Sequence, residues 1–188
     1  VYNKIKKNQR FYFGHTRDVS CITTHPVLPI VASGEEGGEK EGGAIHIWNT
    51  TTMSTLAVLE GVHMGTILSL RFDPHGDRVL SVGQEIVAFY EWSNQARPSR
   101  CSGRTDLDQK SRVKPECIMS TQGETILHCS ELQDEGNIIR CVFVTSRFVR
   151  RVRCDGTNLR WSRMSSAKKV QFTCCVNDDE ENTLIGTS

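Results

Sequence analysis

Two stretches of the chain share one layout, and the distance between them limits what the chain can fold into. Gly14-His15 is followed by Trp48 in the first stretch, and His63 is followed by Trp92 in the second. The two tryptophans lie 44 residues apart. Self-similarity at a period of about 40–45 residues is typical of four-stranded units that stack side by side, because one unit alone cannot bury its apolar face.

Short β-rich runs separated by turn residues fill both stretches, and helical periodicity is almost absent from the sequence. These runs predict an all-β, WD40-type β-propeller, in which strands a to d of each blade run from the centre outward. The predicted strands of the first two blades are residues 19–24, 30–34, 44–48, 56–59, 67–72, 78–82 and 86–92.

The rest of the chain fits the pattern less well. Residues 94–114 are polar and contain Pro and Gly, which predicts a long mobile loop. We expect strands a, b and c of a third blade at 125–129, 138–145 and 158–161, which leaves the Arg-rich run 148–153 without a place.

A fourth blade is predicted to begin near residue 170, so the propeller in this chain is incomplete, with about three and a half blades where closure needs about four or more. We therefore expect the chain to need the rest of its propeller, or another chain, to close the ring. The expected boundaries are 1–13 for the end of a preceding strand, 14–61 for a blade, 62–93 for a blade whose outer strand follows the loop, 94–114 for the loop, 115–167 for a divergent blade and 168–188 for the start of another.

Composition excludes some classes of protein and leaves others open. Hydrophobic residues make up 37% of the chain, and no apolar run approaches the ~18 residues that cross a bilayer, so we expect no membrane span. The eight cysteines form no Cys-x-x-Cys pair and lie mostly in strand-like runs, which favours free thiols in a reducing compartment. The net charge is only +1, but basic residues crowd residues 140–169.

Specific residues near the N-terminus extend the pattern beyond a generic repeat. Val1-Tyr2-Asn3, the run Arg10 to Val19 (RFYFGHTRDV), Thr24-His25-Pro26 and the run Ala44 to Trp48 (AIHIW) stand in the order seen in one family. In this order the chain resembles the N-terminal propeller of the echinoderm microtubule-associated protein-like (EMAP-like) family, and residues 1–13 resemble the end of its hydrophobic motif. The resemblance is strong for residues 1–92, moderate for 168–188 and weak between them. It implies a non-enzymatic, microtubule-associated scaffold.

The histidines of the repeats are interpreted as structural. In WD repeats a His before strand a bonds a Ser or Thr on strand b, which bonds a Trp on strand c; a fully paired chain of this kind makes the fold rigid. The expected sets are His15, Ser33 and Trp48 in one blade, and His63, Ser81 and Trp92 in the next. The usual Asp of the b–c turn is missing from both blades.

No residue pattern predicts catalysis. The His and Cys spacings do not fit a zinc site, and no nucleophile elbow, phosphate loop or dinucleotide fingerprint is present. We therefore expect no enzyme activity, no metal and no cofactor.

The Arg-rich run is the main candidate for a binding surface in the sequence, with Arg147, Arg150, Arg151 and Arg153 as candidate contacts for an acidic partner. The resemblance implies tubulin or axonemal proteins as partners, and a location in the cytoplasm on the cytoskeleton, such as a cilium, flagellum or spindle. A solvated surface is the plainer interpretation of these arginines, and nucleic acid is less favoured because few aromatic side chains accompany them. The alternative function is a general WD40 adaptor in a ubiquitin-ligase or trafficking complex.

Overall fold

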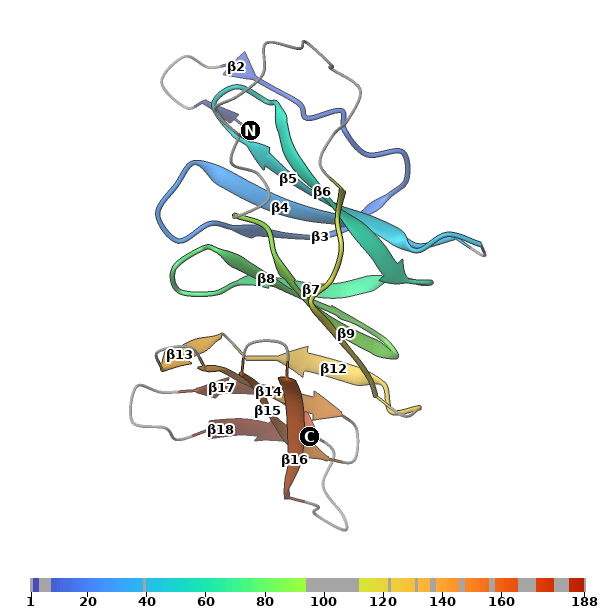
Figure 1. Ribbon diagram of the computed structural model, residues 1–188, viewed down its shortest axis with the longest axis vertical. Coiled ribbons are helices and arrows are strands. Elements are labelled where there is room, and N and C mark those ends of the chain that lie inside the picture. Colours follow the sequence, from blue (N-terminus) through green and yellow to red (C-terminus); the bar gives the residue numbers. More distant parts are fainter. Residues whose placement is uncertain are drawn as a thin grey trace.

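The computed structural model shows antiparallel sheets stacked one after another in an open arc (Figure 1). It describes residues 2–3, 8–38, 40–93, 112–121, 123–130, 132–135, 138–145, 148–155, 158–165, 172–177 and 183–187. In these residues, no helix is long and apolar enough to span a membrane.

The first full sheet contains the four strands predicted for the first blade. They are β3 (Val19–Thr24), β4 (Ile30–Glu35), β5 (Gly43–Asn49) and β6 (Thr55–His63), paired in chain order. Short turns join them, so each strand lies beside its neighbour in sequence. A two-stranded sheet of β1 (Tyr2–Asn3) and β2 (Asn8–Gln9) precedes them.

The second sheet contains β7 (Ile67–Phe72), β8 (Arg78–Gly83), β9 (Ile86–Glu91) and β11 (Cys117–Ser120). Its outer strand β11 pairs antiparallel with β9, so the boundary predicted at residue 115 does not separate the second blade from the third. Most of the predicted loop, residues 94–111, lies outside the described residues. The rest of it is not a loop, because β10 (Arg112–Val113) adds a parallel strand to the outer edge of β6 before the chain returns to β11.

The third sheet corrects two strand assignments. It contains β12 (Ile126–Cys129), β14 (Ile138–Thr145), β15 (Val149–Asp155) and β16 (Asn158–Ser165), with β13 (Gln133–Glu135) paired beside β14. The Arg-rich run is therefore strand c, and the segment with Trp161 is strand d rather than strand c. The run forms a strand because Val149, Val152 and Cys154 supply buried side chains between the arginines.

The fourth sheet consists of β17 (Phe172–Asn177) and β18 (Thr183–Thr187), the positions of strands a and b. No strand pairing joins this sheet to β1 or β2 in the described part of the chain, so the ring stays open. All four a–b pairs contain a register shift at one equivalent place, after Val19, Ile67, Ile126 and Phe172. This recurrence shows the internal repeat independently of the tryptophans.

Register also changes the meaning of the tryptophan spacing. Ser33 lies opposite His46, and Trp48 follows two residues later. In the second sheet Ser81 lies opposite Ala88, so the residue equivalent to Trp48 is Tyr90, and Trp92 lies beyond the end of β9. The blades do repeat, but the 44-residue spacing joins two tryptophans that occupy different positions in their blades.

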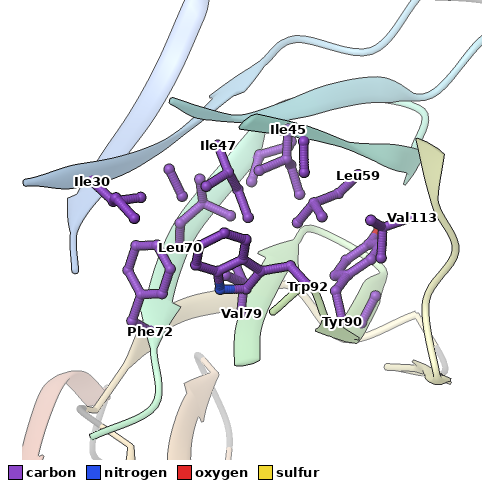
Figure 2. Close-up of a cluster of buried hydrophobic side chains, with 14 residues drawn as sticks. Ile30, Ile45, Ile47, Leu59, Leu70, Phe72, Val79, Tyr90, Trp92 and Val113 are labelled. Atoms are coloured by element: carbon purple, nitrogen blue, oxygen red, sulfur yellow. The ribbon is translucent and has the colours of Figure 1, made fainter. Parts of the chain in front are cut away.

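Three apolar clusters hold the stack together, one at each interface between sheets. Figure 2 shows the cluster between the first two sheets, where side chains from β4, β5 and β6 meet those from β7, β8 and β9. The second cluster joins the second and third sheets, and the third joins the third and fourth. Each fully buried Ile, Leu, Val or Phe contributes about 1.5–3 kcal/mol, so stacking is the main source of stability.

Candidate functional site

The predicted network of the first blade is present as a continuous chain of hydrogen bonds. The Trp48 indole donates to Ser33 Oγ over 2.9 Å, and Ser33 Oγ lies 2.6 Å from His15 Nε2. His15 Nδ1 lies 3.2 Å from Glu35 Oε2. Since a carboxylate only accepts, the protons run from Trp48 through Ser33 and His15 to Glu35.

Glu35 takes the place of the missing Asp and was not identified from the sequence. Its Oε2 also accepts the backbone N–H groups of Thr16 and Arg17, at 3.0 and 3.3 Å. Burial opposes ionisation, but these bonds and the bond from His15 hold the pKa of Glu35 below its usual value. The signal that could have found it is position, because Glu35 is the acidic residue at the end of strand b, directly after the predicted strand 30–34.

Tyr12 is the second residue that the sequence interpretation missed. Its ring stacks on Trp48 with centroids 4.5 Å apart and planes 4° from parallel. Its hydroxyl bonds Thr55 Oγ1 at 2.7 Å and His46 Nδ1 at 2.8 Å. Tyr12 therefore covers the network and ties the segment that precedes β3 to β5 and β6.

The second blade has only part of the predicted network. His63 Nε2 lies 2.7 Å from Ser81 Oγ, and burial lowers the pKa of His63 to about 4. The predicted link from Ser81 to Trp92 is wrong, because the Trp92 indole donates to the Gly76 carbonyl over 2.8 Å. Trp92 lies two residues beyond Tyr90, the position equivalent to Trp48, so it bonds the a–b turn instead.

The first network contains residue types that catalyse reactions elsewhere, but its geometry suits structure. Ser33, His15 and Glu35 stand in the order of a hydrolase triad, yet Ser33 is only 2% exposed and already accepts from Trp48. Nitrogen and oxygen atoms of His15, Glu35 and His46 lie within 4.8 Å of one another, close enough to surround a metal ion. Both ring nitrogens of His15 already bond protein groups, so the cluster is explained without a metal.

The four candidate arginines do not form one group. Arg147 lies outside the described residues. Arg150 is held in place, because its Nε and Nη2 bond both oxygens of Glu124 at 3.0 and 2.6 Å. Its guanidinium also lies 3.5 Å from the centroid of the Trp161 ring. Such a paired and stacked guanidinium stabilises the blade and has little left to offer a partner.

Arg151 and Arg153 lie on the other face of β15 and belong to a larger basic surface. Arg153 lies directly opposite Arg140 of β14 and Arg160 of β16. Arg153 and Arg160 are exposed, and Arg153 Nη2 lies 3.9 Å from Asp155 Oδ2. We call Arg140, Arg151, Arg153 and Arg160 the arginine row.

The inner strands line a cavity of about 530 Å³ between the second, third and fourth sheets. Arg71 of β7 and His128 of β12 stand in its wall beside Cys174 and Cys175 of β17. Burial, with the nearby Arg71 charge, lowers the pKa of His128. The wall also includes the apolar residues Leu184 and Ile185. Because the Arg71 charge stands beside them, a neutral or anionic group fits this cavity better than a cation does.

Comparison of the amino-acid sequence with known proteins identifies proteins that are similar to this chain. No family model matches it. Echinoderm microtubule-associated protein-like 1 of Homo sapiens is 34% identical over 209 aligned residues, which cover 100% of this chain and 22% of that protein. The chain is related to the EMAP-like proteins. The 77 kDa echinoderm microtubule-associated protein of Strongylocentrotus purpuratus is 30% identical over 115 residues, or 56% of this chain and 17% of that protein. EMAP-like 2 of Rattus norvegicus is 26% identical, covering 73% and 23%.

These matches confirm the resemblance to the EMAP-like family, and the chain spans only 17% to 23% of the length of these three relatives. Two solved structures are similar in fold. The RRP9 WD40 repeats match with a TM-score of 0.63 and 10% identity, over 95% of this chain and 55% of that one. The β-propeller domain of Cps50 (Swd1) from Myceliophteria thermophila matches with a TM-score of 0.58 and 15% identity, over 84% and 46%. They confirm an incomplete WD40-type β-propeller.

Proposed function

We propose that the chain is part of a non-enzymatic, microtubule-associated WD-repeat scaffold that works on the cytoskeleton. The names of its EMAP-like relatives support the partner, and the WD40 fold supports a scaffold. The buried network supports the same conclusion, because the residues that could do chemistry hold the blade together instead. We further propose that the acidic surface of tubulin is met by the arginine row.

The observation behind this contact is the placement of like charges side by side. Arg140, Arg153 and Arg160 lie opposite one another on three neighbouring strands. Like charges at directly opposed positions destabilise a sheet. An acidic partner would reduce the repulsion that remains beside the Arg153–Asp155 pair, and guanidinium groups match carboxylates in geometry as well as in charge.

The test is co-sedimentation of the chain with polymerised tubulin, using Arg153→Glu combined with Arg160→Glu. Each reversal replaces an attraction worth about 0.5 kcal/mol by a repulsion of similar size, so the two together cost about 2 kcal/mol and affinity should fall roughly thirtyfold at low salt. Binding of the unaltered chain should also weaken as salt rises to about 0.3 M, because exposed charges are screened.

Lys114→Glu is the matched control, since Lys114 is exposed and lies outside the third sheet. Applied alone, it changes the charge as much as either single arginine variant and should alter binding less than Arg153→Glu does. Equal effects would show that net charge matters and position does not. Sedimentation unaffected by salt, or none at all, would contradict the contact; co-purification of ligase or coat subunits would then favour the adaptor function.

A further inference from the structure

Two cysteines from different sheets meet at the interface between the second and third sheets. Cys117 is the first residue of β11, and Cys154 lies in β15. Their Sγ atoms are 3.8 Å apart, although the residues are 37 positions apart in the chain. Neither cysteine is in a disulfide, Cys117 is partly exposed, and Cys154 is 2% exposed.

We propose that Cys117 and Cys154 form a modification site, at which an oxidant of the peroxide class makes a reversible disulfide between the two sheets. A disulfide needs sulfurs about 2.05 Å apart, so the two atoms must approach by about 1.8 Å. Both side chains already belong to the same apolar cluster, with Phe89 and Val152, so the approach takes place within one packed interface.

The surroundings decide which sulfur reacts first. The hydrogen bond from the Cys117 thiol holds the pKa of Cys154 below its usual value, against the effect of burial, and the Arg78 charge acts in the same direction as the bond. The thiolate is the reactive form, so Cys154 is the nucleophile and Cys117 the resolving thiol. A small oxidant reaches the pair from the partly exposed Cys117 side.

The reaction balances with peroxide as the only added reactant. The Cys154 thiolate attacks one peroxide oxygen, the O–O bond breaks, and the departing hydroxide takes the Cys117 proton to become water. The Cys117 thiolate then attacks the Cys154 sulfenic acid, forms the S–S bond and expels hydroxide, which solvent protonates. The two sulfurs lose two electrons, which the peroxide oxygens gain, and a thiol reductant reverses the step.

The other described thiols lack this combination of closeness and access. Cys129 and Cys141 are only 2% and 1% exposed. Burial raises the pKa of Cys175 to about 12, which leaves it protonated and inert. Cys174 is exposed, but its neighbour Cys175 points to the opposite face of β17.

The cross-link would tie the edge strand of the second sheet to the third sheet. Among the described strands, β11 pairs only with β9, and no short hairpin links these two strands. A disulfide across this distance in sequence removes freedom from the unfolded chain, so we expect the unfolding equilibrium constant to fall on the order of 10²-fold.

The experiment treats the whole chain with hydrogen peroxide, blocks the remaining thiols with an alkylating reagent and maps peptides without reduction. We expect a cross-linked peptide pair joining Cys117 to Cys154, lighter by two hydrogens and lost after reduction. Oxidation should raise the urea midpoint of the unaltered chain and of the control Cys174→Ser, but not of Cys117→Ser. Alkylation of both Cys117 and Cys154 after peroxide treatment, or pairing of either with another cysteine, would overturn the proposal; this readout needs no variant.

Discussion

Ser33 and Ser81 occupy equivalent positions in their strands but hold different numbers of partners. Ser33 Oγ bonds both the Trp48 indole and the His15 ring at 2.9 and 2.6 Å. Ser81 Oγ bonds the His63 ring at 2.7 Å, makes only a long 3.5 Å contact with the Ala88 carbonyl, and receives nothing from a tryptophan. Both serines are at most 2% exposed. Replacing each by alanine therefore removes a different number of buried bonds from sites that look alike in sequence.

The expected cost follows from the partners left behind. A buried donor or acceptor without a partner costs about 1–3 kcal/mol. Ser33→Ala leaves the Trp48 N–H unpaired at 6% exposure and also frees His15, for a total of about 2–4 kcal/mol. Ser81→Ala leaves only His63 unpaired, for about 1–2 kcal/mol. We therefore expect Ser33→Ala to be the more destabilising change by about 1–2 kcal/mol.

Urea unfolding followed by far-ultraviolet circular dichroism measures this difference. The slope of the unfolding free energy against urea should be the same in both variants, so that the midpoints report stability directly. Ser33→Thr, which keeps a hydroxyl, should recover part of the loss. Equal midpoints for the two alanine variants, or a larger loss from Ser81→Ala, would refute the reasoning from partner number.

Two other predictions concern the second sheet. Gly76 has φ +82°, and a Cβ there would overlap the His25 ring, so Gly76→Ala should lower the free energy of unfolding by about 2 kcal/mol or more, while Gly65→Ala, which meets nothing within 4 Å, should change it little. Thermal unfolding compares the pair, and similar losses would contradict the strain. Burial lowers the pKa of His63 to about 4 from 6.5, so its contribution, about 3 kcal/mol, is complete above pH 6.5 and is lost as the pH falls toward 4. Glu116, whose pKa burial and Glu91 raise to about 7, acts in the opposite sense, so the measurement is the difference in acid sensitivity between the unaltered chain and His63→Gln; identical pH profiles would refute it.

Much of the first two sheets could be predicted because their strands are contiguous and joined by short turns. Ile30 to Ala32 and Val79-Leu80 show the apolar runs of strands that are buried on both faces. The pairing of His15 with Ser33 followed from the resemblance to WD repeats, in which a His before strand a bonds a Ser or Thr on strand b. Glu35 and Tyr12 could not be placed with the same ease, because their roles depend on how the segment before β3 lies against the end of β4 and against β5 and β6.

The third sheet was harder for a different reason. Charged residues interrupt β15, and a strand with three arginines does not show the apolar pattern of a buried strand c. In the structure, Arg150 lies over Trp161 and pairs with Glu124, so a charge can occupy a half-buried position at little cost. Aromatic and acidic partners far away in the sequence make this possible, and no local pattern reveals them.

Both errors of assignment have one cause, which is the use of tryptophan as the marker of strand c. Trp92 lies beyond β9, and Trp161 lies in the outer strand β16. The position equivalent to Trp48 is instead the buried residue two places beyond the strand c residue that lies opposite the strand b serine. In the second sheet this residue is Tyr90. In the third sheet Phe143 replaces the serine, and the equivalent residue is Val152. Once the hydroxyl is lost there, no indole needs a partner at strand c. Strand β15 can therefore contain arginines in place of the usual strand c residues. Arg150 lies on one face of this strand and stabilises the blade, whereas the arginine row lies on the other face.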